Sequence, residues 1–191
     1  MAPVQINGQL KYFAADANAD RHQTVVFWEA AVTRPCMLHV RGFAGGWPHG
    51  EIEIIEDPDS PRCKPSDLMV FLSTVLFVSD RAKAVLEHMI DAAAVEWIPA
   101  RYRDERWWIM HGLVLLDALD EERSEVRRGK KSGGVMAVGR LRVIPEKCKG
   151  HALFRLSRGL ETWVYIVSSD FVDAWNNAGL RGFEFIPLGG D

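Results

Sequence analysis

Two stretches of the sequence decide the fold: Val75-Leu76-Phe77-Val78-Ser79-Asp80 and Trp163-Val164-Tyr165-Ile166-Val167-Ser168-Ser169-Asp170. In each, an apolar run of strand character leads into a serine whose hydroxyl can accept a backbone N–H at the start of a helix. An aspartate follows in the first helical turn, where a negative charge suits the helix dipole. Each stretch therefore predicts a strand followed directly by a helix.

The residues that follow continue the same pattern in both copies. In the first, apolar side chains at helical spacing form one stripe over 82–93. In the second, Phe171, Trp175 and Ala178 share a helical face, and Gly179 fits the left-handed residue that ends many helices.

Short strands over 95–98 and 183–186 complete the two copies, each closed by a proline, which cannot donate a ladder hydrogen bond. The first copy runs from Ser79 to Pro99 and the second from Ser168 to Pro187, so the two have nearly the same length. We interpret this agreement as a degenerate strand–helix–strand repeat.

Strands are also expected between the copies, over 106–116, 135–144 and 151–156. The segment 1–65 is irregular, with short β-like runs separated by Gly and Pro. The predicted fold class is α+β, with a mixed, largely antiparallel sheet and two strand–helix–strand units. We expect a single domain over 1–191, in which 1–65 forms an irregular β-rich accessory layer on a core of 66–191.

Composition excludes several classes of protein. The chain of 191 residues carries a net charge of −3 and has an isoelectric point of about 6.1, so no global basic field draws in nucleic acid. No apolar stretch is long enough to cross a membrane, and no signal peptide is visible. Three widely spaced cysteines favour reduced thiols in a cytoplasm. These features leave a homo-oligomer open.

Motifs of catalysis are absent from the sequence: it has no nucleophile elbow, P-loop or dinucleotide-binding glycine pattern. Cys36 and His39 lack a second pair of ligands, so no metal and no cofactor are expected. One alternative is a small enzyme acting on a polar substrate, with Asp117, Asp120 and His111 as acid–base groups. The plainer interpretation is that the carboxylates cap a turn and that the histidine is a hydrogen-bonded interior residue.

Seven tryptophans are the unusual part of the composition. Adjacent strand residues face opposite sides, so one of Trp107 and Trp108 is expected to point outward. Exposed aromatic and arginine side chains are favoured anchors at protein interfaces, and acidic side chains can steer a basic partner. The predicted binding residues are Phe43, Trp47, Glu51, Glu53, Arg101, Tyr102, Arg103, Trp107 and Trp108.

Four stretches occur in an order that carries a family resemblance. They are Val78-Ser79 leading to Trp97-Ile98-Pro99, Leu116-Asp117-Ala118-Leu119-Asp120 followed by Glu121-Glu122-Arg123-Ser124, His151-Ala152-Leu153-Phe154-Arg155-Leu156, and Val167-Ser168 leading to Gly179-Leu180-Arg181-Gly182 and Phe183-Glu184-Phe185-Ile186-Pro187-Leu188. Over roughly residues 75–188 the chain thereby resembles an immunity protein family of bacterial polymorphic toxin systems, formerly a domain of unknown function.

The resemblance implies a function without a catalytic mechanism. Such a protein binds a cognate toxin in the cytoplasm and neutralises it by protein–protein contact. The resemblance supplies no catalytic residues. Its recurring positions are expected to maintain the fold, and they are Asp117, Asp120, Ser124, Phe154, Arg155 and Gly182.

Overall fold

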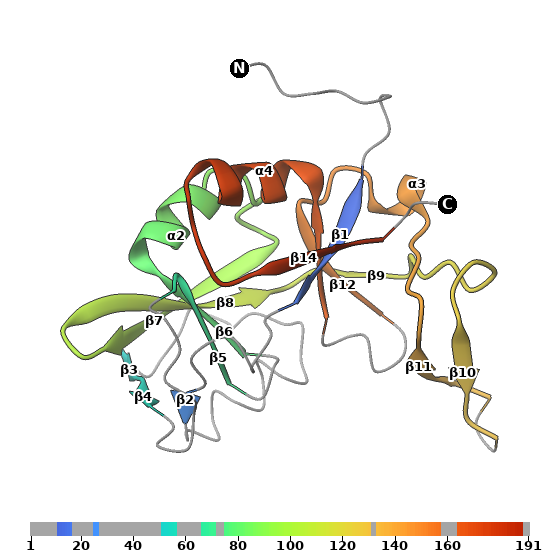
Figure 1. The fold of residues 1–191 in the computed structure, drawn as a ribbon, viewed down its shortest axis with the longest axis horizontal. Helices are drawn as coiled ribbons and strands as arrows, with labels where there is room; N and C mark the ends of the chain where they lie inside the picture. The colour runs from blue at the N-terminus through green and yellow to red at the C-terminus, as the bar shows by residue number, and fades with distance from the viewer. Residues whose placement is uncertain are drawn as a thin grey trace.

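The computed structural model describes residues 11–16, 25–26, 51–56, 66–71, 75–130, 133–157 and 164–188. Two five-stranded sheets form the framework (Figure 1). The first, which we call the β8 sheet, has the order β3-β7-β8-β6-β5, with bounds Ile52–Glu53, Val95–Tyr102, Glu105–Gly112, Val75–Ser79 and Leu68–Phe71.

The second sheet, which we call the β13 sheet, has the order β14-β1-β13-β12-β9, with bounds Glu184–Pro187, Tyr12–Asp16, Tyr165–Ser168, Leu153–Leu156 and Leu115–Leu116. Two small pairs accompany the sheets: β2 with β4 (Val25–Val26, Ile55–Glu56) and β10 with β11 (Val126–Arg128, Val135–Val138). All pairs among the described strands are antiparallel except β3 with β7 and β9 with β12. The predicted mixed, largely antiparallel α+β fold is confirmed.

Both predicted strand–helix junctions are present. Ser79 Oγ accepts a hydrogen bond from Ala82 N (3.1 Å) at the start of α2, Asp80–Leu86. Ser168 Oγ accepts one from Phe171 N (3.3 Å) at the start of α4, Ser169–Asn177. Figure 1 shows the two helices side by side, so the repeated units pack against each other.

Helix α2 is shorter than the apolar stripe over 82–93 predicted. It ends at Leu86, whose carbonyl accepts from both Met89 N (3.1 Å) and Ile90 N (3.0 Å). Asp91 Oδ1 then accepts from Ala93 N (2.9 Å). An aspartate side chain that binds the backbone in this way competes with helical hydrogen bonding, so the stripe continues as turns.

Two predicted strand ends were wrong. Pro99 lies inside β7, which continues to Tyr102. The proline is tolerated because β3 pairs only with Ala100 and Arg101, so no ladder hydrogen bond from residue 99 to β3 is needed. The single strand expected over 106–116 is divided at Gly112, and its two parts, β8 and β9, belong to different sheets. The chain thus crosses from one sheet to the other at this point.

A buried arginine fixes this crossing. Arg155, which is 2% exposed, donates from Nη2 to Gly112 O (2.9 Å), and its Cζ lies 5.3 Å from the centroid of the Tyr165 ring. The Tyr165 hydroxyl donates to Met110 O (3.2 Å) and accepts from Gly112 N (3.3 Å). A side chain at Gly112 would place Cβ 2.6 Å from Tyr165 Cε1, so the close approach requires glycine.

Part of the N-terminal segment belongs to the core. Strand β1 lies between β13 and β14, so Tyr12–Asp16 forms an inner strand of the β13 sheet. The segment 1–65 was predicted to form an irregular accessory layer on the core, because Gly and Pro divide it into short runs. A short apolar run such as Tyr12–Ala15 gives no sign of a partner strand near the other end of the chain. A short helix, α3 (Pro145–Cys148), precedes β12.

The described apolar side chains form three buried clusters. The largest joins α2 and α4 to facing sides of both sheets and contains Phe171 and Trp175. The second lies on the other side of the β8 sheet, around Phe77 and Trp107. The third lies on the other side of the β13 sheet and contains Cys148. Each sheet therefore buries apolar side chains on both of its faces.

Because the Cys148 thiol is buried, we expect the free energy of unfolding to fall at high pH. Burial and the nearby Glu146 raise its pKa from 9.0 to about 12. The unfolded chain therefore releases the thiol proton first, so stabilisation is complete below pH 9 and is lost as the pH rises towards 12. Between about pH 8.5 and pH 10.5, wild type should lose about 2 kcal/mol more free energy of unfolding than Cys148→Ala.

Urea unfolding at both pH values measures this difference. Burial and the nearby Cys148 also raise the pKa of Tyr12 to about 12, so Cys148→Ala removes both the titration of the thiol and its effect on Tyr12. Equal pH dependence of the two proteins would contradict the assignment.

Candidate protein-binding surface

A strip of half-buried aromatic rings and cations lies where α2 meets the β7–β8 hairpin. Its members are Lys83, Trp97, Arg106 and Trp108, and we call it the aromatic–cation strip. Trp97 pairs with Met110 across the hairpin, so Trp108, two residues before Met110, lies diagonally beside it on the same face. Sheet register therefore brings the two tryptophans together.

Cations cover both rings. Lys83 Nζ lies 4.8 Å from the centroid of the Trp108 ring and 5.8 Å from that of Trp97. Arg106 Cζ lies 5.0 Å from the Trp108 centroid. Trp108 Nε1 donates to Asp80 Oδ1 (2.7 Å), and Lys83 also pairs with Glu87. The rings are thus held in fixed positions while remaining partly accessible, which limits the side-chain entropy lost on binding.

The two adjacent tryptophans have different environments, as the strand alternation predicted. Trp108 is the outward member and belongs to the strip. Trp107 is 5% exposed and packs in the second cluster, with its ring 6.2 Å from that of Tyr102 in an edge-to-face contact. The prediction that Trp107 is a binding residue is therefore corrected, because its buried ring is not accessible to a partner protein.

Other predicted binding residues gather at the end of the same hairpin. Arg101 Nε lies 3.4 Å from Glu51 Oε2, and Glu53 is the register partner of Arg101 across β3 and β7. Arg103 has φ 55°, a strained conformation for a residue with a side chain, and its Cζ lies 5.1 Å from the Tyr102 ring centroid. Phe43 and Trp47 lie outside the described residues, as do Cys36 and His39.

Sequence reasoning missed Lys83, Trp97 and Arg106. One feature of the sequence could have revealed the two aromatic residues. A short turn at 103–104 joins two long strands, and such a turn sets which residues of the hairpin face each other. With that register, Trp97 and Trp108 fall on one face. Lys83 comes from the helix, and nothing in the sequence placed the helix over that face.

The three residues of the alternative acid–base site lie in different surroundings. His111 is 1% exposed, and its Nδ1 lies 3.3 Å from Glu96 Oε2. Asp120 Oδ1 accepts from Arg123 N (3.1 Å) and caps a turn, while Asp117 is exposed. None of these side chains is among the described residues that line the two cavities of about 640 and 550 Å³.

The motif positions of the resemblance have contacts within the chain. Ser124 Oγ accepts from Arg142 N (2.9 Å) and donates to Arg142 O (3.3 Å), which holds two segments together. The Phe154 ring is fully buried and lies 5.8 Å from that of Tyr12. These contacts, like those of the buried Arg155, lie within the chain and stabilise the fold. Ser124, Phe154 and Arg155 are not part of the aromatic–cation strip.

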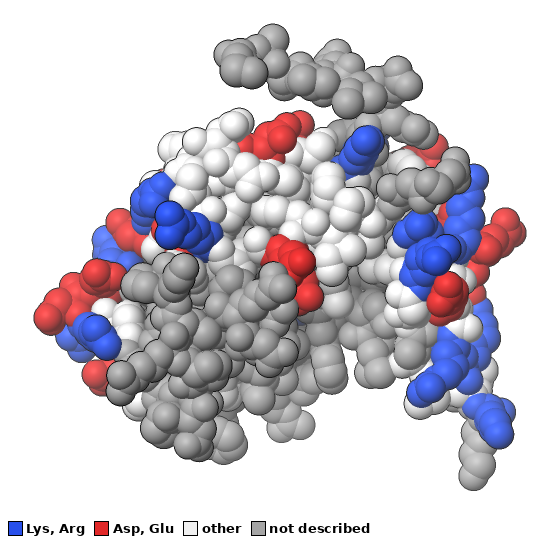
Figure 2. All heavy atoms as spheres, in the orientation of Figure 1, with Lys and Arg blue, Asp and Glu red and all other residues white. Residues whose placement is uncertain are grey.

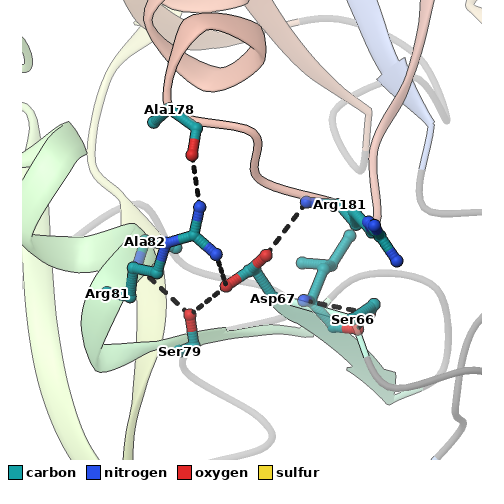
Figure 3. Close-up of polar contacts among 8 residues, drawn as sticks. Ser66, Asp67, Ser79, Arg81, Ala82, Ala178 and Arg181 are labelled. Atoms are coloured by element: carbon teal, nitrogen blue, oxygen red, sulfur yellow. Dashed lines mark hydrogen bonds and ion pairs between the residues drawn. The ribbon is translucent and has the colours of Figure 1, made fainter.

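A polar junction joins the two repeated units (Figure 3). The Asp67 carboxylate accepts from Ser79 Oγ (2.8 Å) and from Arg181 N (3.0 Å), and it lies 3.9 Å from Arg81 Nη1. Arg81 also donates to Ala178 O, beyond the end of α4. One carboxylate thereby connects the N-cap of the first helix to the loop after the second.

The same loop requires a glycine. Gly182 has φ +131°, and a Cβ built on it would lie 2.3 Å from Leu68 Cβ and 3.2 Å from Leu68 N. The backbone of the loop therefore lies directly against β5, and this recurring glycine has a steric cause.

The fold and this surface describe a strand-rich α+β protein with a prearranged aromatic face. The sequence model of one family, described as an immunity protein family (Imm11), matches residues 11–190. The chain therefore belongs to this immunity protein family. The match begins at residue 11, ahead of the roughly 75–188 predicted, and so includes β1. No curated protein matches the chain.

The described residues lack two features that would point to other kinds of protein. No group of three or more His, Cys, Asp or Glu side chains in them is arranged to hold a metal ion. None of the helices they form has the length and apolar character that spanning a bilayer demands.

Proposed function

We propose that this protein binds a cognate bacterial toxin and neutralises it by protein–protein contact, without catalysis. Membership of the immunity protein family over residues 11–190 carries the proposal. Its partner is then a toxin protein, with neither nucleic acid nor membrane involved, and its place of action is the cytoplasm of the cell that makes the toxin.

The aromatic–cation strip is the surface that best suits this role. Tryptophan and arginine dominate the residues whose removal weakens protein interfaces most. Here two half-buried tryptophans stand beside Lys83 and Arg106, with an exposed hairpin end adjoining them. Such a surface needs a polar rim. The side chains at the hairpin end form it, and they are Arg101, Tyr102, Arg103, Glu51 and Glu53.

Co-expression tests the proposal directly. The probe is the toxin domain encoded by the adjacent reading frame, placed under an inducible promoter. Cells that also express this protein should grow after induction, and the two purified proteins should form a stable complex on size exclusion. Because binding is expected to suffice, the purified protein should leave the toxin polypeptide covalently unchanged by intact mass.

The controls separate binding from catalysis. A His111→Asn, Asp117→Asn, Asp120→Asn triple variant removes the alternative acid–base groups, and it should still protect cells. Loss of protection by a folded triple variant, or chemical modification of the toxin, would support the enzyme instead. Growth arrest despite soluble wild-type protein would refute protection altogether.

A further inference from the structure

Asp67 is the residue at which the two repeated units meet (Figure 3). Its backbone binds both of them: Asp67 O accepts from Ser79 N (3.0 Å), and Asp67 N donates to Arg181 O (2.9 Å). Its carboxylate binds the same two residues again, with one oxygen accepting from Ser79 Oγ and the other from Arg181 N. Each unit is therefore joined to Asp67 by one backbone and one side-chain hydrogen bond.

An exposed arginine lies beside this carboxylate and separates it from water. The Asp67 side chain is 14% exposed, whereas Arg81, whose Nη1 lies 3.9 Å from Asp67 Oδ1, is 59% exposed. Figure 2 shows Lys and Arg side chains gathered where Figure 1 draws α2, and the cations of that helix are Arg81 and Lys83. Hydrogen bonds to a carboxylate shielded from water are stronger than exposed ones, so Asp67 holds its neighbours in fixed positions.

Ser79 connects Asp67 to the beginning of α2. The Ser79 hydroxyl donates to Asp67 and accepts from Ala82 N (3.1 Å), so the same oxygen binds the carboxylate and caps the helix. Without the carboxylate, this hydroxyl could rotate away from Ala82, and the first turn of the helix could then shift. The position of the first turn therefore depends on Asp67.

The beginning of α2 carries the two side chains that hold Trp108 from the helix side. Asp80 Oδ1 accepts from Trp108 Nε1 (2.7 Å), and Lys83 Nζ lies 4.8 Å from the centroid of the Trp108 ring. Asp80 directly follows the serine that Asp67 binds, and Lys83 lies about one helical turn further along. A shift at the start of the helix would therefore move both groups relative to the ring.

We propose that Asp67 is a positioning residue for the aromatic–cation strip. Its contacts with Ser79 and with the loop at Arg181 hold the start of α2 in place, and α2 in turn holds the Trp108 ring in the orientation that the partner protein meets. The loop after α4, which is far from the strip in sequence, thereby helps to shape the binding surface. The inference rests on the proposed function where it concerns toxin affinity, whereas the orientation of the ring can be measured in the free protein.

The indole N–H signals in NMR spectra of isotope-labelled protein test the positioning without the toxin. Trp108→Phe identifies the Trp108 signal by its disappearance. In Asp67→Ala this signal should shift, and its proton should exchange with water at least about threefold faster, because the hydrogen bond to Asp80 opens more often. Asp67→Asn should change the signal in the same direction but less, since an amide keeps one acceptor oxygen where the carboxylate has a pair. It carries the test if Asp67→Ala does not fold.

Asp120→Ala is the matched control. It makes the same substitution at a carboxylate of similar exposure, 18% against 14%, which also accepts a backbone N–H and lies near an arginine. The partner of Asp120 in both contacts is Arg123, so the Trp108 signal should stay as in the wild type. Thermal melting shows which variants are folded. An unchanged Trp108 signal in a folded Asp67 variant, or an equal change in Asp120→Ala, would overturn the proposal.

Toxin affinity gives a second measurement. Asp67→Ala should weaken binding of the toxin domain about fivefold in the wild-type background but less than about twofold in Trp108→Ala, because its effect acts through that ring. Equal weakening in both backgrounds would indicate a general loss of structure and contradict the positioning role. If the wild type does not bind the toxin domain, the proposed function fails, while the indole signals still decide whether Asp67 positions Trp108.

Discussion

Substitution of Gly182 by alanine is expected to remove about 4 kcal/mol from the free energy of unfolding, enough to unfold much of the protein. Two costs combine. The backbone has φ +131°, which side-chain-bearing residues rarely adopt, and the new Cβ would overlap Leu68 at 2.3 Å. Leu68 is fully buried in β5, and its backbone is also within 3.3 Å, so the neighbour has little freedom to move.

Gly150→Ala separates the two costs. Gly150 also has a positive φ, +86°, but nothing lies within 4 Å of a Cβ built there. Alanine at this position incurs only the cost of the conformation, about 1 kcal/mol. Urea unfolding followed by tryptophan fluorescence measures both variants. If the two lose equal stability, the contact between the loop and β5 contributes nothing, and conformation alone explains the glycine.

Trp108→Ala is expected to weaken the complex with the toxin domain at least about a hundredfold, because a large ring near the centre of an interface dominates its binding energy. The neighbouring substitution Trp107→Ala should act on the fold instead. Its ring is buried in the second cluster, and its removal leaves a cavity that costs about 3–5 kcal/mol of stability.

Titration calorimetry and thermal melting distinguish these outcomes. Trp108→Phe is the conservative control: it keeps an aromatic ring for Lys83 and Arg106 but loses the hydrogen bond to Asp80, so it should retain most of the affinity. Arg106→Ala should weaken binding about tenfold without loss of stability. Unchanged affinity in a folded Trp108→Ala protein would place the toxin contact elsewhere.

The parts of the fold that sequence predicts well are those set by neighbours in the chain. Ser79 and Ser168 cap helices because a hydroxyl three residues before an unpaired N–H suffices, whatever lies around it. Gly179 adopts the left-handed conformation (φ +64°) for an equally local reason. The two strand–helix–strand units could therefore be found without knowledge of the sheets.

What sequence could not predict depends on residues far apart. Strand β8 ends at Gly112, where Tyr165 lies too close for any side chain, and that contact joins two distant parts of the chain. Pro99 is tolerated because β3 is short and pairs only with the two residues after the proline. The alternating pattern at 51–54 predicted a strand there but not its length or its partner. The aromatic–cation strip needed both the hairpin register and the placement of α2, so only its Trp108 was anticipated.

The position of β1 between β13 and β14 delays completion of the β13 sheet during translation. Asp16 pairs with Glu184, so the ribosome makes β14 long after it has made β1. At ordinary elongation rates this is a delay of roughly 10–30 s, during which Tyr12–Asp16 lacks one of its two flanking strands. Under the proposed function, protection of a newly divided cell would depend on molecules completed beforehand, because nascent chains cannot complete this sheet until β14 has emerged.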